Sequence, residues 1–307
     1  MYQYIAQRIL AAVPVLLGVS LLVFSMLHLV PGDPVRLMLS EFQTTPEQIE
    51  RLRSQLHLDE PLPLQFGRFV WDASHGDLGT SIRTRRPVAV EIADNLPSTL
   101  QLALAGLVVA GVLGVTLGIV AAVNQRSSIE LGSMLLALLG VSMPSFWLGL
   151  LLIFLFSLRL RIFPATGGGD LLHLILPAVT LGLGAAAILA RLTRSSMLEV
   201  LRQEYVTTAR AKGLLEWVVI TRHALKNALI PVVTIFGLQF GQLLAGTFVV
   251  ETVFARPGLG RLVIDGILNK DLPVVQGVVL VVATAYVVVN LLVDLSYGLL
   301  DPRIRYA

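Results

Sequence analysis

The amino-acid sequence predicts an all-α membrane protein with about six transmembrane helices. Hydrophobic residues make up 55% of the 307 residues, charged residues only 14%, and the mean hydropathy is +0.79. This apolar share exceeds that of ordinary globular proteins. Six runs without Asp, Glu, Lys or Arg are long enough to cross a hydrocarbon core, which takes about 20 residues. These runs are 9–29, 96–123, 131–158, 171–190, 228–250 and 272–293.

The first apolar run is interpreted as an uncleaved span that forms, with a short start, a first region at 1–30. It is longer than the roughly 7–15 apolar residues of a secretory signal. It is also followed by Pro31-Gly32-Asp33-Pro34 instead of a small-x-small cleavage site. We therefore expect the first span to remain in the membrane.

The next region, 31–95, is predicted to form a small ordered cap outside the cell membrane. Thr45-Pro46-Glu47 is a capping pattern that predicts a helix through Leu56. Pro61, Pro63 and the 76–79 stretch then interrupt regular structure. The remaining region, 96–307, holds the other five spans and a loop at 191–227.

The basic residues predict the orientation of the chain. Positively charged loops are retained in the cytoplasm. Most of the Lys and Arg residues near span ends fall on one side: Arg8, Arg126, Arg191, Arg194, Arg202, Arg210, Lys212, Arg222, Lys226, Arg303 and Arg305. Arg159 and Arg161 argue for the opposite orientation. We expect the 191–227 loop and both termini to be cytoplasmic.

Small residues recur at helical spacing in three spans. The triplets are Ala110, Gly114 and Gly118; Gly182, Ala186 and Ala190; and Gly237, Gly241 and Ala245. Such stripes let two membrane helices approach closely. Packing within the chain is the favoured interpretation, with a dimer contact or a pore lining as alternatives.

Several kinds of active site are excluded by the sequence. It has no G-x-x-x-x-G-K-[ST] motif, so the chain has no P-loop for ATP. It has no cysteine, and its five histidines are scattered outside metal-ligand spacings. No serine stands in G-x-S-x-G. The sequence predicts no enzyme activity, and no cofactor or metal held by this chain.

Neutral polar residues lie inside the predicted spans. They are Gln101, Ser142, Gln239, Gln242 and Asn290. Ion-coupled transport usually requires ionisable groups within the membrane. The predicted spans contain no Asp, Glu, Lys or Arg, which weakens the interpretation as an ion-coupled transporter. Ser142, Gln239, Gln242 and Asn290 are candidates to line a path for a polar solute. Hydrogen bonding between helices is the alternative that membrane packing favours.

The 197–214 stretch of the basic loop is rich in helix-forming residues and ends near Gly213. Leu198, Leu201, Tyr205 and Thr208 or Ala209 would share one apolar side. Such a helix suits either the groove of a partner protein or a surface of anionic lipid headgroups.

The residue order in this loop resembles a known family. Thr208-Ala209-Arg210-Ala211-Lys212-Gly213-Leu214, with 223–231 after it, is similar to the cytoplasmic signature of permease subunits of binding-protein-dependent ABC importers. The branch that it resembles most takes up dipeptides, oligopeptides, glutathione or nickel. Further matches cover nearly the whole chain: Pro31-Gly32-Asp33-Pro34, Gly76-Asp77-Leu78-Gly79, Arg194-Ser195-Ser196-Met197, Pro257-Gly258-Leu259-Gly260-Arg261, 290–294 and 301–305.

The resemblance implies an ABC importer type I permease core that moves peptides by alternating access. It implies a coupling helix at about 204–214 that a cytoplasmic ATPase binds, with Arg210 and Lys212 pairing to acidic groups there. Its residues would be Glu204, Tyr205, Thr208, Ala209, Arg210, Lys212, Gly213 and Leu214. The general family has Glu where this chain has Thr207, so the resemblance implies no contact for Thr207.

The resemblance also implies partners and a location. These are a second homologous permease, two cytoplasmic ATPases that hold ATP and Mg, and an extracytoplasmic solute-binding protein that Arg256 and Arg261 would face. The chain would lie among lipids in the cytoplasmic (inner) membrane, without nucleic acid. The alternatives are an importer of nickel or metal chelates, a stand-alone secondary transporter or channel, and a membrane-anchored sensory or assembly protein.

Overall fold

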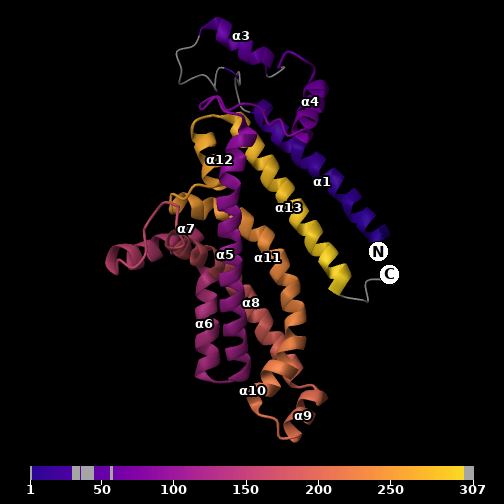
Figure 1. The fold of residues 1–307 in the computed structure, drawn as a ribbon, viewed down its shortest axis with the longest axis vertical. Helices are drawn as coiled ribbons and strands as arrows, with labels where there is room; N and C mark the ends of the chain where they lie inside the picture. The colour runs from indigo at the N-terminus through magenta and orange to yellow at the C-terminus, as the bar shows by residue number, and fades with distance from the viewer. Residues whose placement is uncertain (1, 30–34, 36–44, 56–57, 301–307) are drawn as a thin grey trace. The chain divides into compact units, whose positions relative to one another are not determined.

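The computed structural model describes residues 2–29, 35, 45–55 and 58–300, and these residues are mainly helical (Figure 1). The helices are α1 (Tyr2–Leu29), α3 (Pro46–Gln55), α4 (Leu62–Ser74), α5 (Val88–Val123), α6 (Ser128–Ser142), α7 (Ser145–Leu152), the π-helix η1 (Ile153–Arg159), α8 (Leu172–Leu201), α9 (Glu204–Ala211), α10 (Glu216–Val218), the π-helix η2 (Val219–Ala224), α11 (Leu225–Val253), α12 (Leu259–Leu268) and α13 (Leu272–Leu300). Within the described ranges, strand-like pairing is limited to a single bridge between Thr80 and Pro87.

The chain forms two compact units. The terminal unit comprises 1–98 and 257–307, and the central unit comprises 99–256. The predicted division into 1–30, 31–95 and 96–307 stays a prediction, although its boundary after residue 95 falls inside α5. The Pro31–Pro34 motif, Leu56 and the basic residues Arg303 and Arg305 lie outside the described residues.

The prediction of an all-α protein with about six apolar spans is confirmed. Five described helices are long and apolar enough to cross a membrane, and a bent pair brings the number to six. The predicted boundaries were too narrow, because polar residues also continue these helices. The helix α5 begins at Val88 instead of residue 96, and α8 continues to Leu201 instead of stopping at 190.

The third predicted span, 131–158, is not one straight helix, and this part of the prediction was wrong. It consists of α6 and of α7 with η1, which are bent by 110° relative to each other. Pro144 contributes to the break, because proline disfavours the helical conformation for the residue before it. Met143 is accordingly extended, with φ −102° and ψ 133°.

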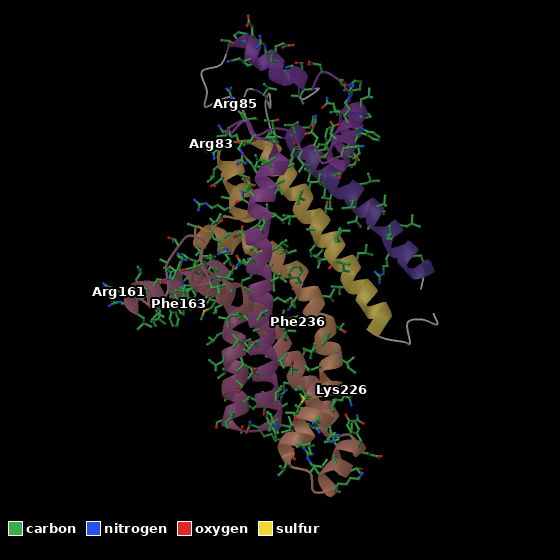
Figure 2. The ribbon with its side chains drawn as sticks, in the orientation of Figure 1. Arg83, Arg85, Arg161, Phe163, Lys226 and Phe236 are labelled. Carbon is green, nitrogen blue, oxygen red and sulfur yellow. The ribbon has the colours of Figure 1, made fainter. Side chains whose placement is uncertain are left out.

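The small-residue stripes of α5 and α8 pack against each other within the central unit. A Cβ atom on Gly114 would lie 2.8 Å from the Ala186 carbonyl oxygen, and one on Gly118 would lie 2.7 Å from that of Ala190. On α11, Phe236 (Figure 2) covers Gly111 of α5, where a Cβ would lie 2.7 Å from its ring. The predicted intramolecular packing is confirmed for these two stripes. Leu102, Leu181, Leu189, Val250 and Phe254 are among the buried residues of the surrounding core.

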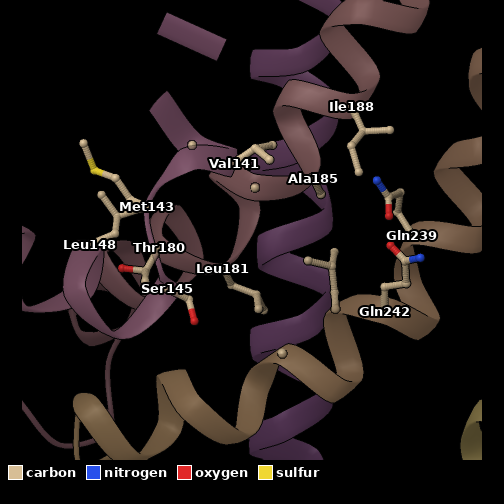
Figure 3. A pocket seen from close by; sticks show the side chains of 14 residues that line it. Val141, Met143, Ser145, Leu148, Thr180, Leu181, Ala185, Ile188, Gln239 and Gln242 are labelled. Atoms are coloured by element: carbon tan, nitrogen blue, oxygen red, sulfur yellow. The ribbon is translucent and has the colours of Figure 1, made fainter. Parts of the chain in front are cut away.

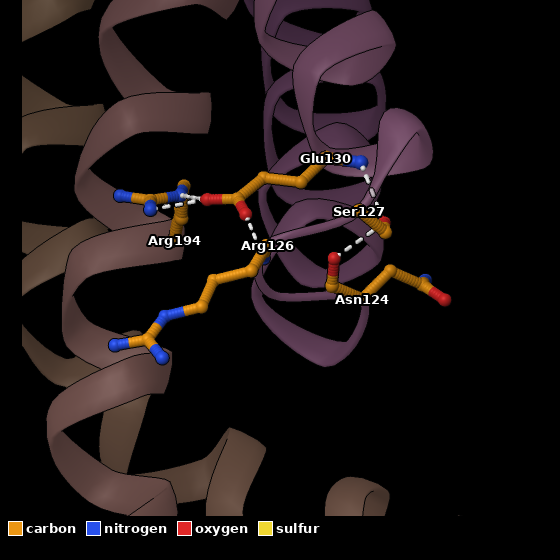
Figure 4. Close-up of polar contacts among 5 residues, drawn as sticks. All are labelled: Asn124, Arg126, Ser127, Glu130 and Arg194. Carbon is orange, nitrogen blue, oxygen red and sulfur yellow. Dashed lines mark hydrogen bonds and ion pairs between the residues drawn. The ribbon is translucent and has the colours of Figure 1, made fainter.

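A polar cluster joins α6 to α8 (Figure 4). Ser127 caps α6 by accepting a hydrogen bond from the Glu130 amide at 3.2 Å, and its hydroxyl donates to the Asn124 carbonyl at 2.6 Å. Arg194 on α8 donates to the Glu130 carboxylate, with Nε 2.7 Å from Oε1. The ion pair thereby attaches the turn between α5 and α6 to the C-terminal part of α8, which contains Arg194.

In the terminal unit, Asp271 fixes the loop that precedes α5. Its carboxylate accepts hydrogen bonds from the Ser81 hydroxyl at 2.6 Å and from the backbone amides of Ile82 and Arg83, each at 3.3 Å. Asp271 and Ser81 are buried, whereas Arg83 and its neighbour Arg85 are exposed (Figure 2). Sequence reasoning did not identify Asp271, because its partners lie about 190 positions away in the chain.

Substituting Gly114 with Ala should lower the stability of the protein. The added methyl group would overlap a backbone carbonyl that has no rotamer to change, and overpacking of this kind typically costs about 1–3 kcal/mol. Thermal unfolding in detergent micelles measures the effect. The matched control is Gly132→Ala on α6, where the new Cβ would have no neighbour within 4 Å beyond the adjoining residues and backbone of its own helix. Equal melting temperatures for the two variants would contradict the close packing.

Substituting Asp271 with Ala should also destabilise the protein. The Ser81 hydroxyl and the two backbone amides that follow it would lose their buried acceptor. A buried group left without its hydrogen bond costs about 1–3 kcal/mol. Asp265→Ala is the control, because Asp265 on α12 is exposed and its surface pairing contributes little. If Asp265→Ala lowers the melting temperature as much as Asp271→Ala, the role given to Asp271 is wrong.

Candidate functional site

The connection between α8 and α11, residues 202–224, holds most of the residues that the sequence singled out. The predicted continuous helix across 197–214 was wrong, because α8 ends at Leu201, α9 begins at Glu204, and Gln203 between them is extended, with ψ 148°. Leu198 and Leu201 therefore belong to α8, while Tyr205 and Thr208 belong to α9. The expected single apolar stripe is divided between two helices.

Apolar contacts hold α9 against the rest of the connection. Val206 and Ala209 are buried and form a cluster with Val219 of η2, against which Val200 and Leu201 also pack. Glu204 begins α9 and is exposed, as are Thr207 and Thr208. The buried side of α9 is thus made by Val206 and Ala209, and the residues between them face solvent.

Polar contacts fix α9 at both ends. The Tyr205 hydroxyl accepts a hydrogen bond from Asn227 Nδ2 at 2.7 Å and donates one to the His223 carbonyl at 3.4 Å. Arg210 donates two hydrogen bonds to Glu216, with Nε–Oε2 at 3.1 Å and Nη2–Oε1 at 2.7 Å. This carboxylate raises the pKa of the Arg210 guanidinium above its ordinary value.

Arg210 has an acidic partner within its own chain. It pairs with Glu216, while the expected pairing with an acidic group of an ATPase stays a prediction. A bidentate pair of this kind also closes the loop between α9 and α10. Lys212, which follows α9, is exposed.

The predicted turn at Gly213 is present. Gly213 has φ +77°, a left-handed conformation that glycine adopts without strain. Its amide donates to the Arg210 carbonyl at 2.9 Å, and the Leu214 amide donates to Ala209 at 3.4 Å. The chain therefore reverses immediately after α9.

Beyond this turn lies a set of exposed apolar side chains. Leu214, Leu215 and Trp217 are 40%, 76% and 74% exposed. We refer to these three residues as the apolar edge. Sequence reasoning included Leu214 but missed Leu215 and Trp217, although two leucines and a tryptophan next to a helix-ending glycine were visible in the sequence. Large exposed side chains that adjoin a fixed helix are suited to contact with another protein.

A pocket of about 320 Å³ lies in the central unit (Figure 3). It is formed where α6 breaks to α7, together with α8 and α11. Its lining consists of Gly140, Val141, Met143, Ser145, Leu148, Thr180, Leu181, Gly184, Ala185, Ile188, Gln239, Gln242, Leu243 and Gly246. None of these described lining residues carries a charge, and most are apolar.

Two of the four predicted path residues line this pocket. Gln239 is only 3% exposed, and its Nε2 has no hydrogen-bond partner among the described residues. Gln242 lies one turn further along α11. Ser142 is exposed at the end of α6 and donates to the Leu138 carbonyl, and Asn290 is on α13 in the terminal unit. The structure brings together Gln239 and Gln242 but not the other two.

The two arginines expected to face a binding protein differ in their surroundings. Arg256 is 3% exposed, and its Nη2 donates to Gln101 Oε1 at 2.7 Å. Burial lowers the pKa of the Arg256 guanidinium, and the nearby Glu251 carboxylate opposes that shift. Arg261 on α12 is exposed, with Nε 3.8 Å from Asp265. Arg256 is therefore an internal residue, which contradicts the expectation that it faces a binding protein.

Two family models match the chain. The model described as "Binding-protein-dependent transport system inner membrane component" matches residues 114–306. The model described as the N-terminal part of the membrane component of binding-protein-dependent transport systems matches residues 1–103. Together these matches include most of both compact units and the connection that contains α9, leaving out 104–113.

Curated relatives match over the full length. The dipeptide transport system permease protein DppB of Escherichia coli (strain K12) is 42% identical over 337 residues, which cover 100% of this chain and 99% of the relative. The di/tripeptide transport system permease protein DppB of Pseudomonas aeruginosa (strain UCBPP-PA14) is 44% identical over 334 residues, with the same coverage.

A solved structure has a similar fold. It is a chain from the inward-facing conformations of the MetNI methionine ABC transporter, with a TM-score of 0.59 and 18% sequence identity. The match covers 68% of this chain and 96% of that chain. At this identity, the likeness concerns the fold alone.

Proposed function

This chain belongs to the family of binding-protein-dependent transport system inner membrane components, and we propose that it is the permease subunit of an ATP-driven importer of peptides. The names of the full-length relatives, which are permeases for dipeptides and tripeptides, support the substrate class. We place the chain in the cytoplasmic membrane, with both termini and α9 on the cytoplasmic side.

The observation that carries this proposal is the way α9 is attached. It follows α8 directly and is fixed to η2 and α11 through Val206, Ala209 and the Tyr205–Asn227 hydrogen bond. Both α8 and α11 also line the pocket. A force on α9 would therefore reach both walls of the pocket, because Val206 and Ala209 pack against Leu201 of α8 and Val219 of η2.

In this proposal, α9 and the apolar edge sit in a cleft of a cytoplasmic ATPase. Two such ATPases hold ATP and Mg and supply the energy, since this chain has no nucleotide motif. The ATPases bias alternating access if they bind one conformation of the permease better than the other. A second homologous permease and an extracytoplasmic binding protein complete the assembly, and the exposed Arg261 is a candidate contact for the latter.

The apolar edge provides the main test. The double substitution Leu215→Ala and Trp217→Ala should reduce the recovery of ATPase subunits with the purified permease by at least about tenfold. The reason is that an exposed Trp at the centre of an interface typically contributes about 2 kcal/mol or more to binding. Co-purification in detergent and ATP-dependent peptide uptake in proteoliposomes measure the result. Both side chains are largely exposed, so the fold should survive.

The matched control is Leu268→Ala with Trp71→Ala. These side chains have similar exposures, 71% and 66%, and belong to α12 and α4. ATPase recovery should be unchanged in the control. Wild-type recovery and uptake in the Leu215 and Trp217 variant would refute the assignment, and uptake by this chain without ATPases would refute the importer.

A further inference from the structure

The start of α7 is a helix end without a side-chain cap. The residue before it is Pro144, whose φ and ψ are −57° and 136° and which provides no capping side chain. The first hydrogen bond that α7 closes is from the Leu148 amide to the Pro144 carbonyl, at 3.0 Å. The amides of the first turn therefore lack partners within the helix, and they give this end a partial positive charge.

This helix end adjoins the pocket. Met143, Ser145 and Leu148, which lie before, at and after the start of α7, all line it (Figure 3). Broken membrane helices commonly direct such uncapped amides at the anionic groups of a solute. Since the described lining has no charged side chain, an anion in this pocket would be met by amide and hydroxyl groups.

The second, independent observation is Gln239. Its side chain lines the pocket and is only 3% exposed, and its amide nitrogen has no hydrogen-bond partner in the part of the chain that the structure describes. A buried donor without a hydrogen bond is costly and calls for an explanation. A half-turn of the side-chain amide exchanges its nitrogen and oxygen, so either atom can serve a ligand that enters the pocket.

We propose that this pocket binds the carboxyl-terminal end of a peptide. The carboxylate accepts hydrogen bonds from the first-turn amides of α7 and from Ser145, and Gln239 pairs with the adjoining peptide group. The inference rests on the proposed function for its choice of solute. It gives a chemical role to the break between α6 and α7, which hydropathy had predicted to be one continuous span.

The size and polarity of the pocket fit this ligand. Its volume of about 320 Å³ is at the lower end of the range for small-molecule sites, which starts at about 300 Å³. Side chains such as Leu181 and Leu243 would contact the variable parts of the peptide without selecting a particular one. A carboxylate held by amides, without a cationic side chain, is bound weakly enough to leave again, as passage requires.

A labelling experiment on the assembled importer tests this site directly. The chain contains no cysteine, so Met143→Cys introduces a single thiol into this subunit at the pocket. Dialanine should slow its alkylation by a small maleimide, and dialanine amide, which lacks the carboxylate, should not. The control is Leu171→Cys. Leu171 is 73% exposed and does not line the pocket, so neither compound should change the alkylation rate of a cysteine at this position.

The substitution Gln239→Leu should raise the dialanine concentration that gives half-protection by roughly 3- to 10-fold, the effect of one hydrogen bond. Leu238→Ala, at the neighbouring and more exposed position of α11, should leave it unchanged. Equal protection by dialanine and its amide, or no protection, overturns the carboxylate site. Wild-type protection in Gln239→Leu overturns the role of Gln239.

Uptake of radiolabelled dialanine by the same complex separates the two proposals. ATP-dependent uptake without protection of Met143→Cys contradicts this site and leaves the importer assignment standing. Protection by dialanine but not by its amide supports the pocket even if uptake fails, which would contradict only the proposed function.

Discussion

The contact between α5 and α8 is the constraint on which the central unit depends. Their backbones approach so closely that the carbonyls of Ala186 and Ala190 occupy the space of the Cβ atoms that Gly114 and Gly118 lack. In lipid there is little hydrophobic force between helices, so dispersion in such close contacts does much of the holding. With Arg194 also bound to Glu130 on α6, α8 is held firmly on two sides. A helix held in this way moves with its neighbours.

The broken α6–α7 pair is tolerated for a related reason. Backbone groups that leave a helix within the membrane need partners other than lipid, so such breaks occur only against protein or a cavity. Here the break borders the pocket, whose other walls are α8 and α11. The same two helices lead into α9 at its two ends, through Leu201 and through η2. In the proposed importer, the solute site and the ATPase contact would therefore be connected by α8 and α11.

The sequence predicted the helical class, five of the six spans and the turn at Gly213, because each depends on local composition or on one conformational rule. It failed where hydropathy or polarity was used without the break at Pro144 or without the partners that a side chain has elsewhere in the chain. The break at Pro144 lies inside an unbroken apolar run, so hydropathy alone could not reveal it. Arg210 was expected to reach outward because Glu216 was not recognised as its partner. Arg256 was expected to be a surface charge, because the sequence does not show that it donates a hydrogen bond to Gln101 of α5. Path residues chosen by polarity alone, such as Asn290, fell in a different unit from Gln239.

In the proposed assembly, the internal pairing of Arg210 with Glu216 leaves apolar contact as the main basis on which an ATPase would recognise α9. Burying a Leu side chain contributes about 1.5–3 kcal/mol, and a Trp offers still more surface. Moving a two-state equilibrium from 1:99 to 99:1 requires about 5.5 kcal/mol of differential binding. Leu215 and Trp217 together approach that value if the ATPase cleft covers them in only one conformation. In that proposal, the Arg210–Glu216 pair would hold the apolar edge in place, so that a movement of the cleft would be transferred to α8 and α11 instead of being lost in the loop.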